Sequence, residues 1–154
     1  MTVREYVVGL VTDGSYMAFI RKNRPQWQRG LLNGIGGKVE ENESHKQAMV
    51  REFREETGLT IEASRWRLLA NMEYPAQAHI VFYTARVSHD ELSSLKSETD
   101  ERVEVHSVEY PHMYPQRFIH NLHWLIPLAL HYERYAAVNV IGLVDPVEGD
   151  IVQC

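Results

Sequence analysis

Residues 36–59 read GGKVEENESHKQAMVREFREETGL, and this stretch decides the fold. It crowds Glu43, Glu52, Glu55 and Glu56 into one short segment. Like charges three or four residues apart on a helix repel each other by roughly 0.2–0.5 kcal/mol per pair. Such a cluster costs stability unless a cation binds among the carboxylates. The stretch therefore indicates a binding site for a positive ion.

The same stretch carries the signals of a single helix. Ser44 followed by Gln47 is a capping-box pair, which predicts that the helix begins at residue 45. Gly58 is well placed to terminate it after residue 57. On a helix with these bounds, Glu52, Glu55 and Glu56 share an arc of about 100°, because residues three and four apart are surface neighbours. A solvated acidic face is the alternative interpretation of this pattern.

The rest of the chain alternates strand and turn signals. Runs rich in β-branched and aromatic residues predict strands at 6–11, 16–21, 66–74, 79–87, 103–108 and 138–144. Further helices are predicted at 90–95 and at 121–135, with Asn121 as the N-cap residue and Pro127 bending the second helix. The glycine-rich residues 33–37 are expected to be irregular. We interpret residues 1–154 as one mixed α/β domain, with a C-terminal strand and tail at 136–154.

Composition and charge exclude several classes of function. The chain has 154 residues and a formal net charge of −5, without a basic run, so binding to large nucleic acids is not expected. No apolar run approaches the ~20 residues that span a bilayer, and the N-terminus lacks the features of a signal peptide. Cys154 is the single cysteine. We expect a cytoplasmic monomer or homodimer that acts on a small molecule.

The spacing of the charged residues forms a motif. Gly37 is followed after five residues by Glu43, and after seven more by Arg51 and Glu52. Glu55, Glu56, Gly58 and Leu59 complete the pattern G-x5-E-x7-R-E-U-x-E-E-x-G-U, in which U is hydrophobic. This stretch, residues 37–59, resembles the Nudix box of the Nudix hydrolases. Phe53 stands where an aliphatic residue is more usual.

The resemblance extends from about residue 6 to residue 132 and is to the MutT-like branch, which includes oxidised-purine nucleoside triphosphatases. It implies an α/β/α sandwich with a mixed β-sheet between helices. It also implies a Mg²⁺-dependent hydrolase that converts a nucleoside triphosphate, or an oxidised one such as 8-oxo-dGTP, to the monophosphate and pyrophosphate. Nucleotide sugars and dinucleoside polyphosphates are alternative substrates. A sensor domain that binds nucleotides without turnover is the alternative of another class.

The box supplies the candidate metal ligands. Carboxylate and carbonyl oxygens are the donors that Mg²⁺ prefers, and Mn²⁺ accepts the same set. We expect Glu52, Glu55, Glu56 and the main-chain carbonyl of Gly36 to hold the ion. Glu52 is also a candidate base for the attacking water.

Further catalytic candidates surround these ligands. We expect Arg51 to hold a box glutamate in place, and Glu43 to fold back toward the box. Glu101 lies in an acidic turn where MutT-like enzymes often place an additional glutamate, and Glu98 and Glu104 are its rivals.

Substrate contacts are expected from four further residues. Asn33 and Asn121 are candidates to read a purine base, because an amide offers both a donor and an acceptor. Their alternative roles are to shape a turn and to cap a helix. Gly37 and Lys38 are further candidates beside the box. Base stacking is open to Trp27, Tyr110, Tyr114 and Phe118, and a zinc site at His120 and His123 is disfavoured because no cysteine lies nearby.

Overall fold

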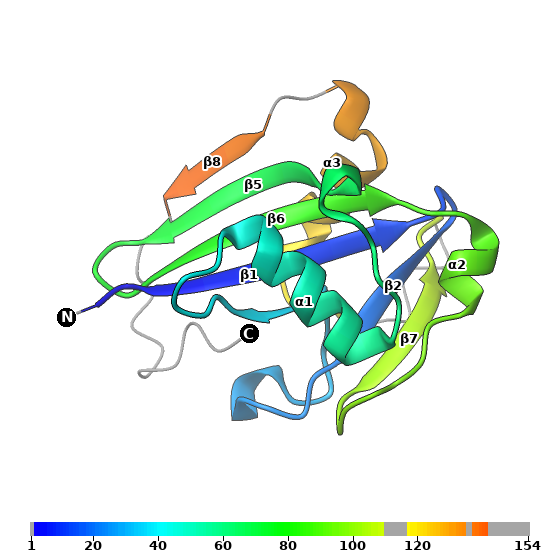
Figure 1. The fold of residues 1–154 in the computed structure, drawn as a ribbon, viewed down its shortest axis with the longest axis horizontal. Coiled ribbons are helices and arrows are strands. Elements are labelled where there is room, and N and C mark those ends of the chain that lie inside the picture. Colours follow the sequence, from blue (N-terminus) through cyan, green and yellow to red (C-terminus); the bar gives the residue numbers. More distant parts are fainter. Residues whose placement is uncertain (1, 110–116, 135–136, 142–154) are drawn as a thin grey trace.

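The computed structural model describes residues 2–109, 117–134 and 137–141, which form a mixed β-sheet with helices packed on it (Figure 1). The strands are β1 (Arg4–Thr12), β2 (Tyr16–Arg21), β3 (Leu32–Asn33), β4 (Ile35–Lys38), β5 (Arg67–Tyr74), β6 (Ala78–Arg86), β7 (Arg102–Ser107) and β8 (Val138–Ile141). The α-helices are α1 (His45–Thr57), α2 (His89–Ser93) and α3 (Leu122–Leu130). Short 3₁₀ helices cover Gln26–Gln28, Ala63–Arg65 and Tyr132–Arg134.

Strand β1 runs through the centre of the sheet, whose main order is β3-β2-β1-β6-β5-β8. It pairs in parallel with β6, and β5 pairs in parallel with β8, whereas the other pairs are antiparallel. On its other side, the first half of β1 pairs with β4 and its end pairs with β2. This branching places the glycine-rich strand β4 against the helix α1.

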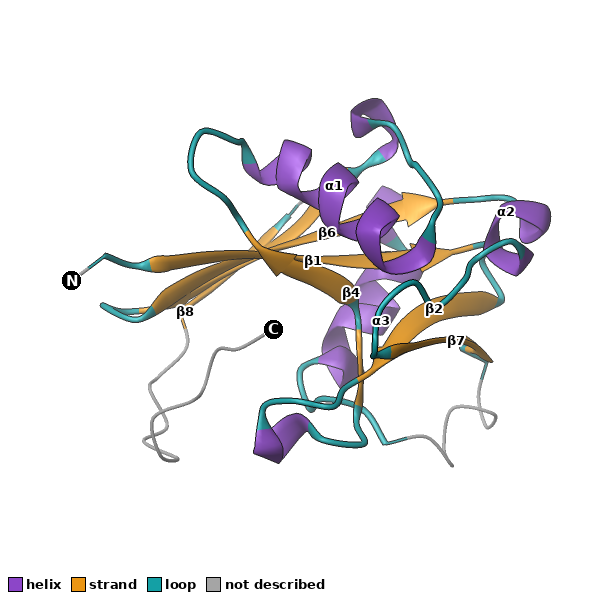
Figure 2. Ribbon diagram, turned by 60° about the horizontal axis from the view of Figure 1, so that its bottom comes forward, coloured by secondary structure: helices purple, strands orange, loops and turns teal. Residues whose placement is uncertain are grey.

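The sheet separates two hydrophobic cores, because successive residues of a strand point to opposite faces. On one face Val7 packs in a buried cluster with Phe53 of α1. On the other face Val8 packs in a second cluster with Leu125 of α3. Figure 2 shows α1 and α3 on opposite sides of the sheet. The architecture is therefore the α/β/α sandwich expected from the sequence.

The boundaries of α1 agree with the sequence signals. The Ser44 side chain accepts a hydrogen bond from the Gln47 main-chain N–H, and the Gln47 side chain accepts one from the Ser44 N–H. At the other end, Gly58 adopts φ 79°, a left-handed conformation that glycine reaches without strain. The expected helix over residues 45–57 is confirmed.

The expectation of an irregular glycine segment at residues 33–37 is wrong. All of its residues except Gly34 belong to β3 or β4, and β4 pairs with β1 from Tyr6–Lys38 to Gly9–Ile35. The pairing supplies the hydrogen bonds that offset the poor strand propensity of glycine.

The remaining elements differ from expectation mainly at their ends. Helix α3 ends at Leu130 instead of residue 135, and a 3₁₀ turn follows it. Asn121 precedes α3 but makes no side-chain capping hydrogen bond to the described residues, since its own backbone is already helical at φ −68° and ψ −20°. The last strand is described to Ile141, and the tail at 142–154 lies outside the described residues. Among the described residues, no helix has the length and apolar character needed to cross a membrane.

Candidate active site

The box glutamates lie along one side of α1. Glu52 and Glu56 are half-buried, whereas Glu55 is exposed. Glu52 Oε1 accepts a hydrogen bond from Arg51 Nη1 at 2.8 Å, and Glu56 Oε2 accepts one from the Thr99 hydroxyl at 2.7 Å. Glu55 Oε2 accepts a longer hydrogen bond from Arg51 Nη1 at 3.2 Å, so each of the three expected carboxylate ligands contacts a neighbouring side chain.

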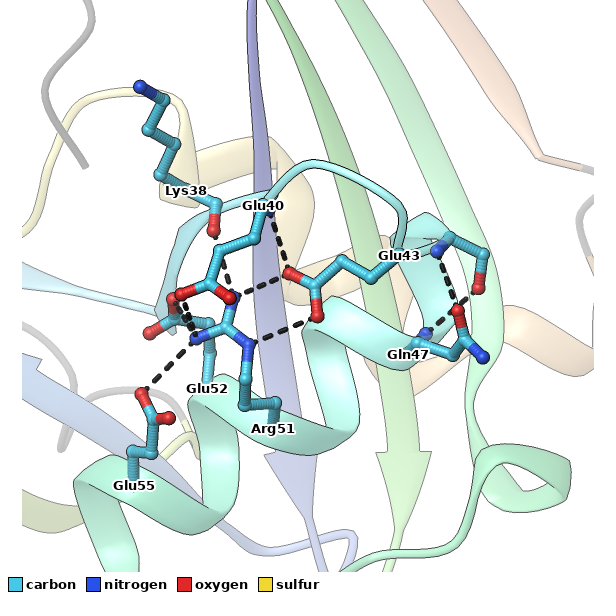
Figure 3. A network of polar contacts seen from close by, with 8 residues as sticks. Lys38, Glu40, Glu43, Gln47, Arg51, Glu52 and Glu55 are labelled. Carbon is cyan, nitrogen blue, oxygen red and sulfur yellow. Dashed lines mark hydrogen bonds and ion pairs between the residues drawn. The ribbon is translucent and has the colours of Figure 1, made fainter.

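The guanidinium group of Arg51 lies at the centre of this arrangement (Figure 3). It donates to Glu43 through Nη2 at 2.6 Å and through Nε at 3.1 Å. It also donates to Glu52 at 2.8 Å, to Glu55 at 3.2 Å and to the main-chain carbonyl of Lys38 at 3.0 Å. Arg51 thus ties the loop that precedes α1 to the glutamates on the helix.

This network changes the pKa of its members. The hydrogen bond from Arg51 is the main reason why the pKa of the Glu43 carboxyl lies below its usual value. The same bond is the largest cause of the raised pKa of Arg51. Both groups are therefore charged at neutral pH, and charge-assisted hydrogen bonds of this kind are the stronger ones in proteins.

Burial has the opposite effect on the carboxyl groups of Glu52 and Glu56. It raises the pKa of both, because a surrounding of low dielectric disfavours the charged form. Arg51 opposes this rise for Glu52, and Thr99 opposes it for Glu56. A divalent cation between the carboxylates would remove the penalty. Carboxylate oxygens held on a rigid helix fit Mg²⁺ or Mn²⁺ in donor type and charge.

Two glycines of β4 allow the strand to approach its neighbours closely. A Cβ atom on Gly37 would lie 2.5 Å from the Glu52 carboxylate, and one on Gly36 would lie 1.9 Å from the carbonyl oxygen of Val7. Neither position has room for a side chain. Gly37 therefore lies directly against a proposed metal ligand, and Gly36 is its neighbour in the same strand.

Glu101 is buried in the turn that precedes β7. Its Oε1 accepts a hydrogen bond from Lys22 Nζ at 2.9 Å, and its Oε2 accepts one from the main-chain N–H of Asn23 at 2.5 Å. The charge of Glu101 also contributes to the raised pKa of Glu56. The structure therefore brings Glu101 next to the box, but pairs it with a buried lysine.

The rivals of Glu101 have other surroundings. Glu104 forms ion pairs with Arg21, Arg102 and His106, which together lower its pKa to about 2, with Arg21 as the largest cause. Glu98 is exposed and lies against Gly58. The contacts of Glu104 are thus with neighbouring side chains of the sheet, and Glu101 has the better position for a role beside the box.

Sequence reasoning missed two contacts of this region: Lys22, by sequence a candidate phosphate contact, pairs with Glu101, and Thr99 donates to Glu56. Each contacts an acidic side chain that is far away in the chain, since Lys22 is 79 positions from Glu101 and Thr99 is 43 positions from Glu56. No local pattern marks such pairs. From the sequence, Thr99 could be identified only as a member of the acidic turn.

The two asparagines expected to read a base line one cavity. Asn33 comes from β3 and Asn121 from the start of α3, and Trp27, Tyr74 and Ile119 line the same cavity of about 40 Å³. Asn33 Oδ1 accepts from the Gly34 N–H at 2.8 Å, which is the turn-shaping contact named as its alternative role. Asn121 Oδ1 is buried and has no hydrogen-bond partner among the described residues. A buried acceptor without a donor is a costly feature and indicates a ligand or a water molecule.

The other candidates are placed as follows. Lys38 is exposed, and Figure 3 shows its amino group pointing away from the Arg51 guanidinium. Phe118 is buried against Phe19 with ring centroids 5.1 Å apart, as a core residue. Tyr110 and Tyr114 lie outside the described residues. His120 and His123 are exposed and belong to no cluster of potential metal ligands among the described residues.

Comparisons with known proteins agree with this site. The NUDIX domain family model matches residues 3–125 of the chain. The CTP pyrophosphohydrolase of Escherichia coli (strain K12) is 33% identical over 81 residues, which cover 53% of this chain and 58% of that protein. A MutT structure from work on Aliivibrio salmonicida and Vibrio cholerae has a TM-score of 0.65 at 21% identity, covering 85% of this chain and 99% of that chain. The NUDIX domain of NrtR from Shewanella oneidensis, solved with ADP-ribose, has a TM-score of 0.67 at 16% identity, covering 87% and 89%.

The chain belongs to the NUDIX family. The curated relative is named a pyrophosphohydrolase, and Nudix hydrolases generally use divalent metal ions. The resemblance inferred from residues 37–59 is confirmed. The two solved structures show the fold alone at their level of identity, and the curated relative is matched over little more than half of its length.

Proposed function

We propose that the protein is a nucleoside triphosphate pyrophosphohydrolase, which converts a nucleoside triphosphate and water to the monophosphate and pyrophosphate. The observation that carries this proposal is the buried, unpaired Oδ1 of Asn121 in a cavity shared with Asn33. The box residues alone require only that the substrate contain a pyrophosphate group. A cavity lined by amide side chains offers, in addition, a place for a nucleotide base. Asn33 in β3 is followed directly by β4, which carries Gly37 to the box.

Glu52, Glu55 and Glu56, with the carbonyl of Gly36, would hold the divalent ion. When bound, the ion neutralises charge on the phosphate oxygens and draws water close to phosphorus. Glu52 is the candidate to take the proton of the attacking water, because burial raises the pKa of its carboxyl. As the water oxygen bonds to one phosphorus of the α,β-anhydride, the bond from that phosphorus to the bridging oxygen breaks, and the monophosphate and pyrophosphate separate. Arg51 holds the Glu52 carboxylate in one position.

Asn121 would accept a hydrogen bond from a base N–H through its free Oδ1. The cavity of about 40 Å³ is room for a water molecule and not for a purine, so its lining must open for a base to enter. Trp27, which is 40% exposed, and His120 are the exposed residues of the cavity lining. A purine or an oxidised purine, which has N–H groups along its edge, is the first choice of substrate.

A second candidate is a pyrimidine triphosphate. The relative with 33% identity over 81 residues is named CTP pyrophosphohydrolase. The cytosine amino group is a donor that would also pair with Asn121 Oδ1. Cytidine triphosphate therefore belongs in any first test.

A pyrophosphate-release assay across ordinary and oxidised triphosphates, nucleotide sugars and dinucleoside polyphosphates tests the proposal. We expect turnover of a triphosphate with Mg²⁺ and none in excess EDTA. Glu56→Gln should lower kcat at least ~10²-fold, the scale of losing a main electrostatic stabiliser. Glu62→Gln, a change of an exposed glutamate outside the box, is the matched control and should retain the activity. Faster turnover of nucleotide sugars would reject the triphosphate assignment, and tight nucleotide binding without any turnover would identify a sensor.

A further inference from the structure

Two histidines and a glutamate converge at the start of α1, about two helical turns before Glu52. Glu5 comes from β1, His45 is the first residue of α1, and His79 lies near the start of β6. His45 Nε2 is 2.7 Å and His79 Nδ1 is 2.9 Å from the same oxygen, Glu5 Oε2. All three potential ligand atoms lie within 4.8 Å of one another. We call these residues the Glu5 triad.

The hydrogen bonds behind His79 define which of its nitrogens carries a proton. Asn71 Nδ2 donates to Asn139 Oδ1 at 3.1 Å, so the other amide atom, Asn71 Oδ1, is the one that faces the histidine. This oxygen is 3.3 Å from His79 Nε2 and accepts its hydrogen. In the neutral ring, Nδ1 then directs a lone pair at the Glu5 carboxylate. Two lone pairs face each other there, and only a proton or a metal ion between them makes the contact favourable.

A metal ion fits the spacing of this triad. Transition-metal bonds to histidine nitrogen and carboxylate oxygen are about 2.0–2.2 Å long, so two ligand atoms lie about 2.9 Å apart at a right angle and about 3.4 Å apart at the tetrahedral angle usual for Zn²⁺, a difference that side-chain shifts of about 0.5 Å would supply. The two nitrogen-to-oxygen distances of the triad are 2.7 and 2.9 Å. The hydrogen bond from His79 to Asn71 is also the usual support of a histidine that ligates a metal.

We propose that Glu5, His45 and His79 bind a divalent transition metal ion, with Zn²⁺ as the representative, at a site separate from Glu52, Glu55 and Glu56. Two imidazoles favour zinc, nickel or cobalt over Mg²⁺, which prefers oxygen donors. The site therefore differs from the box in the class of ion that it selects. A bound ion would join β1, the start of α1 and β6.

Solvent and ions can reach this site. Glu5 and His45 line an open groove of about 610 Å³, together with the acidic residues Glu40, Glu41 and Glu43. The side chains of the triad are 24–39% exposed, which leaves coordination positions for water. An acidic groove raises the local concentration of cations and so favours capture of the ion.

The test measures binding by the full chain and not its activity. Zn²⁺ is titrated calorimetrically in the presence of millimolar Mg²⁺, which occupies the oxygen ligands of the box. The double variant H45Q/H79Q should lose at least about 100-fold in Zn²⁺ affinity, because loss of supporting residues alone costs 10–100-fold. His89→Gln is the matched control and should bind Zn²⁺ as the parent does, since His89 pairs with a single carboxylate, Asp13.

Further measurements keep the proposal falsifiable if a variant folds poorly. Glu5→Gln retains the size of the side chain and removes the ligand charge. Asn71→Ala keeps all three ligands and removes the hydrogen bonds of Asn71 to His79 and Asn139, so Zn²⁺ affinity should fall about 10–100-fold in this variant. Circular dichroism establishes that each variant is folded. With Co²⁺ in place of Zn²⁺, a visible absorption band should appear in the parent and be absent from H45Q/H79Q. Zn²⁺ affinity equal to that of the parent in folded Glu5→Gln and H45Q/H79Q would overturn the proposal, as would a parent that binds no Zn²⁺ beside Mg²⁺.

Discussion

Replacing Arg51 by lysine tests whether the box geometry depends on one guanidinium group. Arg51 makes five hydrogen bonds to described residues, namely two to Glu43 and one each to Glu52, Glu55 and the Lys38 carbonyl. A lysine ammonium has three donors on one atom and cannot match this planar fork. At least two charge-assisted bonds are lost, and one such bond contributes about 1.5–3 kcal/mol. With two such bonds lost, we expect Arg51→Lys to lower the free energy of unfolding by about 3–6 kcal/mol.

The larger effect of Arg51→Lys should be on catalysis. Without the bond at 2.8 Å, the Glu52 carboxylate is free to leave its position against Gly37. A misplacement of about 1 Å in a reacting group can cost about 10²-fold in rate, so we expect kcat to fall by that factor. KM should change little, because Arg51 contacts protein groups and not the substrate in this arrangement. Steady-state kinetics of pyrophosphate release measure both constants.

Arg65 provides the matched control for Arg51. It also forms a forked ion pair, with Glu91 at 2.7 and 2.9 Å, and it donates to the Arg86 carbonyl at 3.1 Å. Arg65→Lys should cost stability in the same way and leave kcat unchanged. A rise of KM alone in Arg51→Lys would refute the reasoning and would indicate direct contact between Arg51 and a phosphate.

Asn33→Ala and Asn121→Ala should each raise KM for the preferred triphosphate roughly 5- to 150-fold, because an unpaired polar edge in a dry pocket costs about 1–3 kcal/mol; equal losses on all nucleotides would show that the asparagines are structural. Glu52→Gln should lower kcat more than Glu101→Gln, since Glu101 is already neutralised by a buried lysine; the reverse order in the same assay would move the base to the acidic turn. Glu104→Gln should make the free energy of unfolding less dependent on pH in acid. The Glu104 carboxyl has a pKa of about 2 in the folded state and near 4.5 in the unfolded state. Its contribution to stability, at most about 3 kcal/mol, is therefore present above pH 4.5 and is lost as the pH falls toward 2. Thermal unfolding of both proteins at pH 6 and pH 3 measures this, and equal pH slopes would contradict it.

Local signals in the sequence predicted the helix α1 well. Ser44, Gln47 and Gly58 act on their immediate neighbours, so the ends of α1 follow from residues within one turn. The arc of glutamates follows from helix geometry once these ends are known. The network of Arg51 was predicted in kind, and the structure extends it to the carbonyl of Lys38.

Features that depend on distant residues could not be predicted in this way. The glycines at 34, 36 and 37 give this segment a composition typical of a loop, yet Gly36 and Gly37 lie in a strand because β1 pairs with residues 35–38. The close approach at Gly36 also depends on the backbone of Val7, almost thirty positions earlier. The sequence suggested a capping role for Asn121, but the backbone there is helical and the side chain points into a cavity instead.

The two hydrophobic cores support different parts of the proposed function: one lies behind the box glutamates, and the other surrounds the cavity proposed to hold the base. Val8 and Phe82, which line the asparagine cavity, belong to the cluster of α3, whereas Val7 and Phe53, behind the box glutamates, belong to the cluster of α1. Adjacent residues of a strand thus serve different tasks. Mutations that reshape the cavity can accumulate in such a protein without disturbing the packing of α1. A library directed at the α3 face is accordingly a practical route to variants with a new nucleotide preference and an intact hydrolytic centre.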